Sequence, residues 1–256
     1  MNLILGIVLA ICIGMSLGLI GSGGSVVAVP ILIYVLNVPP KSAIAMSLVI
    51  VGAVSLIGVI PHWQQGNVNL RIAALFSPTA MLGAYIGARI ASLPIISPTF
   101  QLISFAIAMV VAAILMICNN SNELDDSDRH KNYQWLVIPA EGLGVGILTG
   151  FVGIGGGFLI IPALVLLGKV PIKEAVGTSL IVITLKSMTG FAGYFGRVSI
   201  DFNLMMYFTI AASIGTIAGA YFTKFTQPKQ LETGFGLFMI AIAIFIVIKE
   251  YVFGLT

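Results

Sequence analysis

Long apolar runs separated by short polar turns make up almost the whole chain. Such runs cover about residues 3–20, 41–60, 70–91, 98–117 and 135–152, and they continue from about residue 172 towards the C-terminus. A membrane-spanning helix needs roughly 20 mainly apolar residues. The pattern therefore predicts an all-α, polytopic membrane protein with about eight to ten membrane segments.

Two glycine-rich stretches interrupt the apolar runs, at Gly21–Gly24 and at Gly153–Gly157. Clustered glycines are hard to hold in a helix, because glycine loses the most backbone freedom on ordering. Inside a bilayer such a break is tolerated only where the backbone is buried in protein or faces water. The apolar elements that follow, at about residues 25–36 and 158–167, have only about 10–12 residues and are too short to cross. Each glycine-rich stretch therefore ends one apolar helix and is followed by a half-helix.

The second half of the chain repeats the first with an offset of 132 residues. The offset brings Gly21 onto Gly153, Pro30 onto Pro162 and Lys41 onto Lys173. Later positions agree as well, since Gly83 and Gly87 coincide with Gly215 and Gly219. The sequence therefore divides into a first membrane repeat (1–118), a polar linker (119–134) and a second membrane repeat (135–256).

The basic residues indicate how the repeats are oriented. An outside N-terminus and an odd number of crossings per repeat would place seven of them on the cytoplasmic side, where Lys and Arg are enriched. These residues are Arg71, Arg129, Lys131, Lys169, Lys173, Lys224 and Lys229. We therefore expect inverted repeats in a multi-pass membrane protein.

Composition narrows the classes of function. Only 8% of the 256 residues are charged, and the mean hydropathy is +1.11, so lipid is the expected surrounding. The net charge of +3 is small and scattered, which argues against nucleic acid as a partner. Cys12 and Cys118 both lie in apolar runs, and we expect them to be packing residues. We expect no catalytic residues, metal site or cofactor; a homo-oligomer is left open.

The glycine breaks are the predicted substrate site. A half-helix that begins at a break presents free N–H groups and the positive end of its dipole, which suits an anion. Paired broken segments are also the best sequence pointer to a transporter's binding site. Alternatively, the glycines only allow close helix packing. The predicted substrate-binding residues are Gly21, Ser22, Gly23, Gly24, Ser25, Gly153, Ile154, Gly155, Gly156, Gly157, Ser47, Thr178, Ser179 and Lys186.

Lys186 is the most informative of these residues, because it lies well inside an apolar run and its repeat equivalent is Val54. An ionisable group within a span suggests function, and we expect Lys186 to offset the charge of the substrate. The alternative is a lysine whose amine reaches the interface. Glu141 and His62 are expected at the interface, Glu141 near the start of its helix with proton coupling as a lesser alternative. Thr178, Ser179 and Ser47 could instead bond to their own helices.

These motifs resemble those of the TauE/SafE family, the sulfite-exporter-like membrane permeases. The resemblance rests on both glycine breaks, each followed by a proline, and on a Pro-x-Lys-x-Ala-x-x-x-Ser-Leu pattern at Pro39–Leu48 and Pro171–Leu180. It covers essentially the whole chain. It implies a multi-pass transporter of the cell inner membrane that moves small sulfur-containing anions such as sulfite or organosulfonates.

The preferred function is a secondary transporter of a small oxyanion that works by alternating access. An anion channel, or a permease for another small solute, is the alternative. An intramembrane enzyme would need paired titratable groups or metal ligands in its spans, and His62 and His130 are not placed to provide them. A purely structural membrane protein would have no need of exposed backbone at membrane depth.

Overall fold

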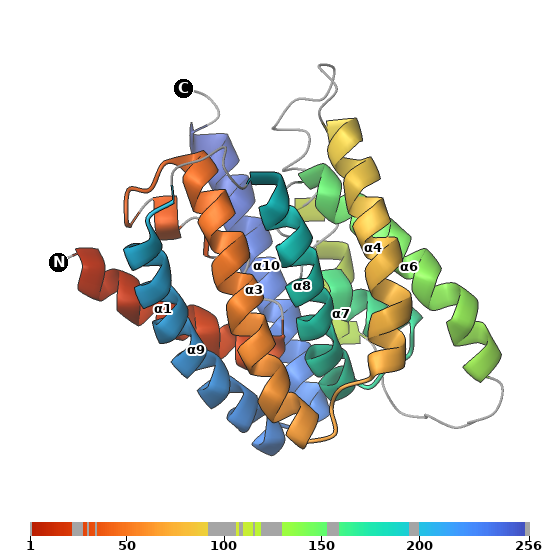
Figure 1. Ribbon diagram of the computed structural model, residues 1–256. Coiled ribbons are helices and arrows are strands. Elements are labelled where there is room, and N and C mark those ends of the chain that lie inside the picture. Colours follow the sequence, from red (N-terminus) through yellow and green to blue (C-terminus); the bar gives the residue numbers. More distant parts are fainter. Residues whose placement is uncertain are drawn as a thin grey trace. The chain divides into compact units, whose positions relative to one another are not determined.

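The described part of the chain consists of helices joined by short turns. The computed structural model describes residues 2–21, 28–29, 31–33, 35–91, 106–107, 110–114, 116–118, 130–152, 159–194 and 200–253. No strand occurs within these residues (Figure 1). The predicted all-α class is therefore confirmed for the described residues.

The helices follow the apolar runs closely. In chain order they are α1 (Asn2–Ile20), α3 (Pro40–Gln64), α4 (Leu70–Ala91), α6 (His130–Val152), α7 (Ile160–Pro162), η2 (Ala163–Leu167), α8 (Ile172–Tyr194), α9 (Phe202–Phe225) and α10 (Pro228–Phe253). Within the described residues, three helical stretches are long and apolar enough to cross a membrane, namely Ala45–Gln64, Leu70–Gly87 and Phe202–Phe225. Two shorter apolar stretches are Leu5–Ile20 and Val137–Thr149. Apolar helices of this kind are those of a membrane protein.

Two predicted boundaries were wrong. Helix α3 continues through Pro61 to Gln64, so the polar turn is confined to residues 65–69. A proline inside a helix removes one backbone hydrogen bond and crowds the carbonyl of the preceding turn, yet α3 continues for three residues beyond Pro61. Helix α6 begins at His130, inside the stretch 119–134 that was predicted to be linker. Polar residues of its first turns extend the helix without adding to the apolar run.

The chain forms two compact units, and each contains parts of both sequence halves. The first comprises Met1–Ala73 and Lys173–Thr226, and the second comprises Ala74–Ile172 and Gln227–Thr256. The first unit therefore contains α1, α3, α9 and most of α8. The second holds most of α4 together with α6, α7, η2 and α10.

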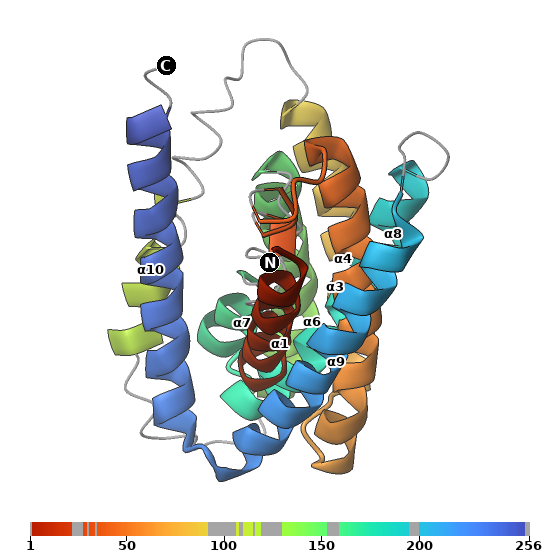
Figure 2. The ribbon, with the colours of Figure 1, turned by 90° about the vertical axis from the view of Figure 1, so that its left-hand side faces the viewer.

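In the first unit, α1 packs closely against α9 (Figure 2). A Cβ atom added at Gly14 would meet the carbonyl oxygen of Ala212, and one added at Gly215 would meet that of Ile11. Glycines spaced four apart let helix backbones approach in this way, as is typical of membrane helices. We call such a close, glycine-lined contact between two helices a glycine seam. In this one the Thr216 hydroxyl donates to the Gly14 carbonyl oxygen at 2.9 Å and adds a polar contact.

Helices α3 and α8 of the same unit run antiparallel to each other. A Cβ at Gly52 would lie 2.9 Å from Cβ of Ser187, whereas one at Gly58 would lie 3.2 Å from Leu180. The later residue of α3 thus contacts the earlier residue of α8, as in an antiparallel pair. Between them the Thr184 hydroxyl lies 3.4 Å from the Gly52 carbonyl oxygen.

The second unit contains the same kind of glycine seam, between α4 and α6. A Cβ at Gly146 would meet the carbonyl oxygen of Ala80, and one at Gly83 would meet that of Leu143. These contacts correspond to those of Gly14 with Ala212 and of Gly215 with Ile11, because each partner is shifted by 132 residues. The first helix of one half thus packs on the fourth helix of the other half, once in each unit.

The short segments after the two breaks also end alike. Asn37 and Lys169, which are 132 residues apart, are the two described non-glycine residues with positive φ, at 54° and 51°. The N–H of Val38 donates to the Leu32 carbonyl at 2.9 Å, and the N–H of Val170 donates to the Leu164 carbonyl at 2.9 Å. The local backbone after each break is therefore duplicated.

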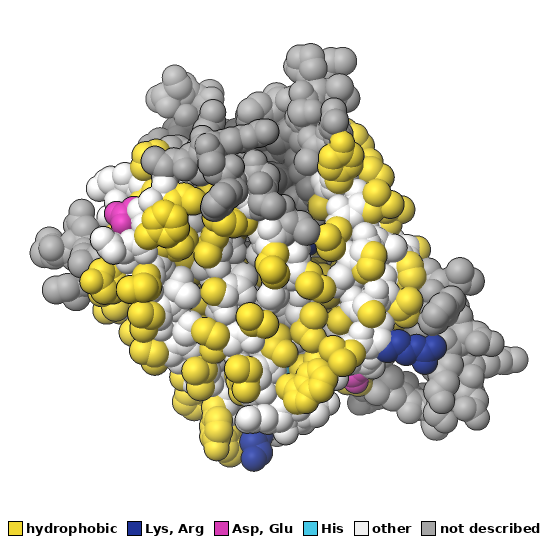
Figure 3. All heavy atoms as spheres, in the orientation of Figure 1, with side chains coloured by type: hydrophobic (Ala, Val, Ile, Leu, Met, Phe, Trp, Pro, Cys, Tyr) yellow, Lys and Arg dark blue, Asp and Glu magenta, His cyan; other side chains and the backbone are white. Residues whose placement is uncertain are grey.

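On the described part of the surface, apolar side chains are spread over the visible face and few charged side chains lie among them (Figure 3). Among the exposed large residues are Leu56, Met188, Tyr207 and Leu237. Cys12 and Cys118 are free and exposed, so the prediction that they pack inside the protein was wrong. Their place on apolar helices makes them part of the apolar exterior.

Candidate functional site

The described edge of the first glycine break lies against α8. Gly21 ends α1 with a φ of 81°, and its N–H donates to the Leu17 carbonyl at 2.6 Å. Side chains rarely adopt this conformation, so glycine suits the position. A Cβ here would also lie 2.9 Å from Ser179 Oγ and from Cγ1 of Val176. The break therefore begins where α1 touches α8.

Two predicted site residues meet at this point. The Ser179 hydroxyl lies 3.2 Å from the Gly21 carbonyl oxygen and 2.8 Å from the Val176 carbonyl oxygen of its own helix. The hydroxyl therefore bonds to its own helix, as the alternative expected, and also contacts the edge of the break. Its role in substrate binding stays a prediction. Ser179 is fully buried. Its repeat equivalent, Ser47, is also buried, on α3.

Thr178 has a structural partner outside its own helix. Its hydroxyl oxygen accepts the N–H of Asn69 at 3.0 Å. The Asn69 side chain donates to a carboxylate oxygen of Glu174 at 2.6 Å and accepts the N–H of Ile72 at 3.1 Å, which caps α4. Thr178 therefore helps to fix the turn between α3 and α4 against α8, a role that sequence did not suggest.

Lys186 lies on the same face of α8 as Ser179. Seven residues separate the two positions, which is close to two helical turns, or about 10 Å along the axis. Lys186 is partly exposed, with buried Thr184 and Ser187 beside it in the sequence. The role of Lys186 in offsetting a substrate charge stays a prediction.

Most of the predicted site lies outside the described residues. This holds for Ser22, Gly23, Gly24, Ser25, Gly153, Ile154, Gly155, Gly156 and Gly157. Their role as a substrate site stays a prediction.

His62 is not at the interface, contrary to the prediction. It is fully buried on α3, and its Nε2 donates to the Gly18 carbonyl oxygen at 2.9 Å. Within the described residues its Nδ1 has no partner. The Gly18 carbonyl oxygen also lies 3.4 Å from the Thr223 hydroxyl. Extension of α3 past Pro61 carries the ring to the end of α1, just before the glycine break.

Glu141 also differs from its prediction. Because α6 starts at His130, Glu141 stands near the middle of the helix, and only 7% of it is exposed. One feature of the sequence could have indicated this burial, because the repeat equivalent of Glu141 is the apolar Leu9. The described residues contain no group of three or more His, Cys, Asp or Glu side chains suited to a metal ion.

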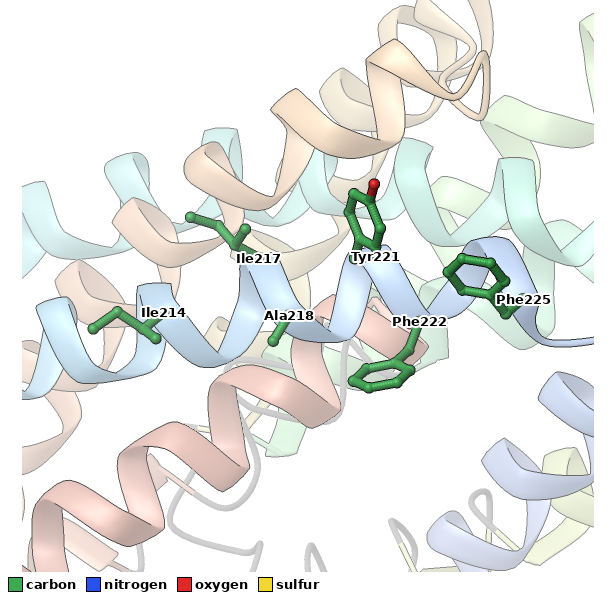
Figure 4. A pocket seen from close by; sticks show the side chains of 6 residues that line it. All are labelled: Ile214, Ile217, Ala218, Tyr221, Phe222 and Phe225. Carbon is green, nitrogen blue, oxygen red and sulfur yellow. The ribbon is translucent and has the colours of Figure 1, made fainter.

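A surface groove of about 400 Å³ follows α9 and is separate from the predicted site. All of its lining residues come from this one helix (Figure 4). They are Ile214, Ile217, Ala218, Tyr221, Phe222 and Phe225. Five of these six side chains are apolar and none is charged, so the groove is part of the apolar exterior of an exposed helix.

Comparison with known proteins agrees with the motifs. The model of the family described as "Sulfite exporter TauE/SafE" matches residues 6–246. A probable membrane transporter protein of Xylella fastidiosa is 32% identical over 244 residues, covering 93% of this chain and 92% of that protein. The probable membrane transporter protein YdhB of Bacillus subtilis is 26% identical over 224 residues, which are 86% of this chain and 90% of YdhB.

A third relative, the probable membrane transporter protein MJ0441 of Methanocaldococcus jannaschii, is 29% identical over 88% of this chain and 89% of its own length. No solved structure matches the chain. The chain therefore belongs to the sulfite exporter TauE/SafE family, whose members are membrane transporters and not enzymes.

Proposed function

We propose that this transporter moves a small sulfur-containing oxyanion, of the sulfite or organosulfonate class, across the cell inner membrane by alternating access. The family description supports the substrate class. The observation that carries the site is the Gly21–Ser179 contact, which holds the first glycine break against the helix that bears Lys186. Free N–H groups after a break, serine hydroxyls and an ammonium are the donors that an oxyanion needs.

Alternating access requires two similar halves that rock about a central site. Antiparallel packing of the equivalent helices α3 and α8 supports inverted repeats. Two helices related by a two-fold axis run antiparallel when the axis is perpendicular to them, and such an axis lies in the membrane plane. The proposed multi-pass orientation has the N-terminus outside and the basic turns in the cytoplasm.

Flux measurements in proteoliposomes test the function. Labelled sulfite, sulfate, thiosulfate and a small sulfonate are offered to the wild type, Lys186→Ala, Gly156→Val and, as a control, Lys224→Ala. Lys224 is an exposed cation in the last turn of α9. We expect saturable flux of one sulfur anion that only the first two substitutions abolish. Absence of flux for every sulfur anion would refute the substrate class, and non-saturable flux with a conductance would favour an anion channel.

A further inference from the structure

Glu141 is a buried carboxyl group that the proposed anion site does not use. It lies on α6, about 16 Å before the end of the helix at Val152 if the rise is 1.5 Å per residue. Only 7% of the residue is exposed. Neither Oε1 nor Oε2 has a hydrogen-bond partner among the residues that the structure describes.

The carboxyl group points at the turn that ends η2. A Cβ added at Gly168 would lie 3.3 Å from Oε2 of Glu141 and 2.8 Å from the Leu164 carbonyl oxygen. A larger residue at position 168 would therefore press on both groups. The glycine leaves the space that the carboxyl group occupies.

The equivalent place in the first half is apolar. Subtracting 132 turns Glu141 into Leu9 and Gly168 into Leu36. There the Leu36 side chain packs over α1, since its Cδ2 lies 2.8 Å from the position of a Cβ at Gly6. The duplicated scaffold is thus built with leucines, and the glutamate with its facing glycine is particular to the second half.

We propose that Glu141 is a proton-binding site, and that its proton moves in the same direction as the anion in each transport cycle. An ionised carboxylate without partners is far more costly to bury than a neutral carboxylic acid. Isolated carboxyl groups inside membrane proteins mark proton relays. The coupling rests on the proposed function, whereas proton binding does not.

Within the described residues, no cation forms a hydrogen bond to either carboxylate oxygen of Glu141. Helix η2 carries only Ala, Leu and Val, and the turn after it carries Lys169, which is exposed. On α4, which packs on α6 through Gly142, the titratable residues of this unit are Tyr85 and Arg89. On α10, Lys229 donates to the Ile117 carbonyl oxygen at 3.4 Å.

Electrostatics sets the sense of the coupling. A bound anion and an ionised carboxylate in one low-dielectric protein repel each other. Protonation of Glu141 removes this repulsion, so anion and proton favour each other's binding. One proton is taken up by a carboxylate oxygen on one side of the membrane and released on the other.

Infrared spectroscopy tests proton binding without any transport. The purified protein is compared with Glu141→Gln and with the control Asp201→Asn. Asp201 is an exposed carboxylate that accepts the N–H of Leu204, and an asparagine can accept the same bond. We expect the C=O stretching band of a protonated carboxylic acid at neutral pH in the wild type and in Asp201→Asn. Loss of that band in Glu141→Gln is expected, and an identical band in all three proteins, or none in any, would refute the proton site.

Coupled flux tests the second part. A pH-sensitive dye is enclosed in proteoliposomes, and a gradient of methanesulfonate is imposed, because a sulfonate does not itself carry protons near neutral pH. We expect acidification that accompanies sulfonate entry in the wild type and is lost in Glu141→Gln. Sulfonate flux without proton flux, or a strict need for Na⁺, would overturn the coupling. Absence of flux for any sulfur anion would instead refute the proposed function and leave the infrared result to stand alone.

Discussion

The Thr184 hydroxyl lies 3.4 Å from the carbonyl oxygen of Gly52, and these two residues are equivalent positions of the duplicated sequence. The same hydroxyl bonds to the Leu180 carbonyl oxygen of its own helix at 2.8 Å. Equivalent residues of the two halves therefore lie side by side on α3 and α8. Lys186 stands two residues farther along α8, whereas its equivalent, Val54, is buried on α3. The lysine therefore introduces a charge near this contact that the first half does not have.

Lys186→Met tests whether this charge serves the anion. We expect anion flux to fall by about two orders of magnitude, as loss of an attraction of about 2–3 kcal/mol predicts. Lys186→Arg keeps the charge and should retain part of the flux. The measurement is initial flux against substrate concentration in proteoliposomes. Unchanged flux in Lys186→Met would show that the amine only reaches the interface.

Ser179→Ala tests the contact at the first break. The substitution removes the hydroxyl that bridges Val176 and the Gly21 carbonyl oxygen. We expect weaker substrate binding, seen as a raised KM, with little loss of thermal stability. Ser213→Ala is the matched control, because the Ser213 hydroxyl donates to the Thr209 carbonyl oxygen of its own helix at 2.7 Å. Equal KM values in the two variants would contradict a role for Ser179 at the break.

The paired glycine seams predict equal sensitivity in the two units. Gly14→Ala and Gly146→Ala each place a methyl group against a carbonyl oxygen of the facing helix. We expect each to destabilise the protein by about 1–3 kcal/mol through overpacking. Gly144→Ala is the control, since a Cβ there meets nothing within 4 Å. Thermal unfolding in detergent compares the three, and a stable Gly146→Ala variant beside an unstable Gly14→Ala variant would argue against equivalent seams.

The helices could be predicted from the sequence because hydropathy reports burial in lipid directly. The expected range 70–91 matches α4 at both ends. The offset of 132 also predicted a duplicated structure, and the matching bonds of Val38 and Val170 follow it. The start of α6 was missed, because polar residues such as His130 can extend a helix beyond the membrane.

The polar contacts could not be predicted, since they join residues far apart in the sequence. His62 looked interfacial because a proline and a tryptophan adjoin it, yet helix extension buries its ring against Gly18. Glu141 looked interfacial because the predicted helix began too late. In both cases a small error in a helix boundary changed the environment of a titratable group.

His62→Ala tests the buried contact with Gly18. The substitution leaves the Gly18 carbonyl oxygen without its ring donor and creates a cavity. We expect a loss of about 2–4 kcal/mol of stability, from the lost bond and from the cavity. His62→Gln has an amide N–H that can reach the same oxygen and should recover part of the loss. Comparable melting temperatures for wild type and His62→Ala would show that the bond contributes little.

Asn69→Asp separates the two roles of the Asn69 side chain. Aspartate is as good an N-cap as asparagine, so the bond from the Ile72 N–H is kept. The amide that donates to Glu174 becomes a carboxylate, which places two negative charges side by side. We therefore expect Asn69→Asp to destabilise the protein at neutral pH by about 1–3 kcal/mol, through repulsion and a lost donor. The loss should shrink as the pH falls and one carboxylate takes up a proton.

Asn69→Asp with Glu174→Gln restores a donor opposite the new carboxylate and should recover most of the stability at neutral pH. Thermal unfolding of both variants across pH checks this, and a loss that does not depend on pH would show that the bond to Glu174 is not what the variant disturbs.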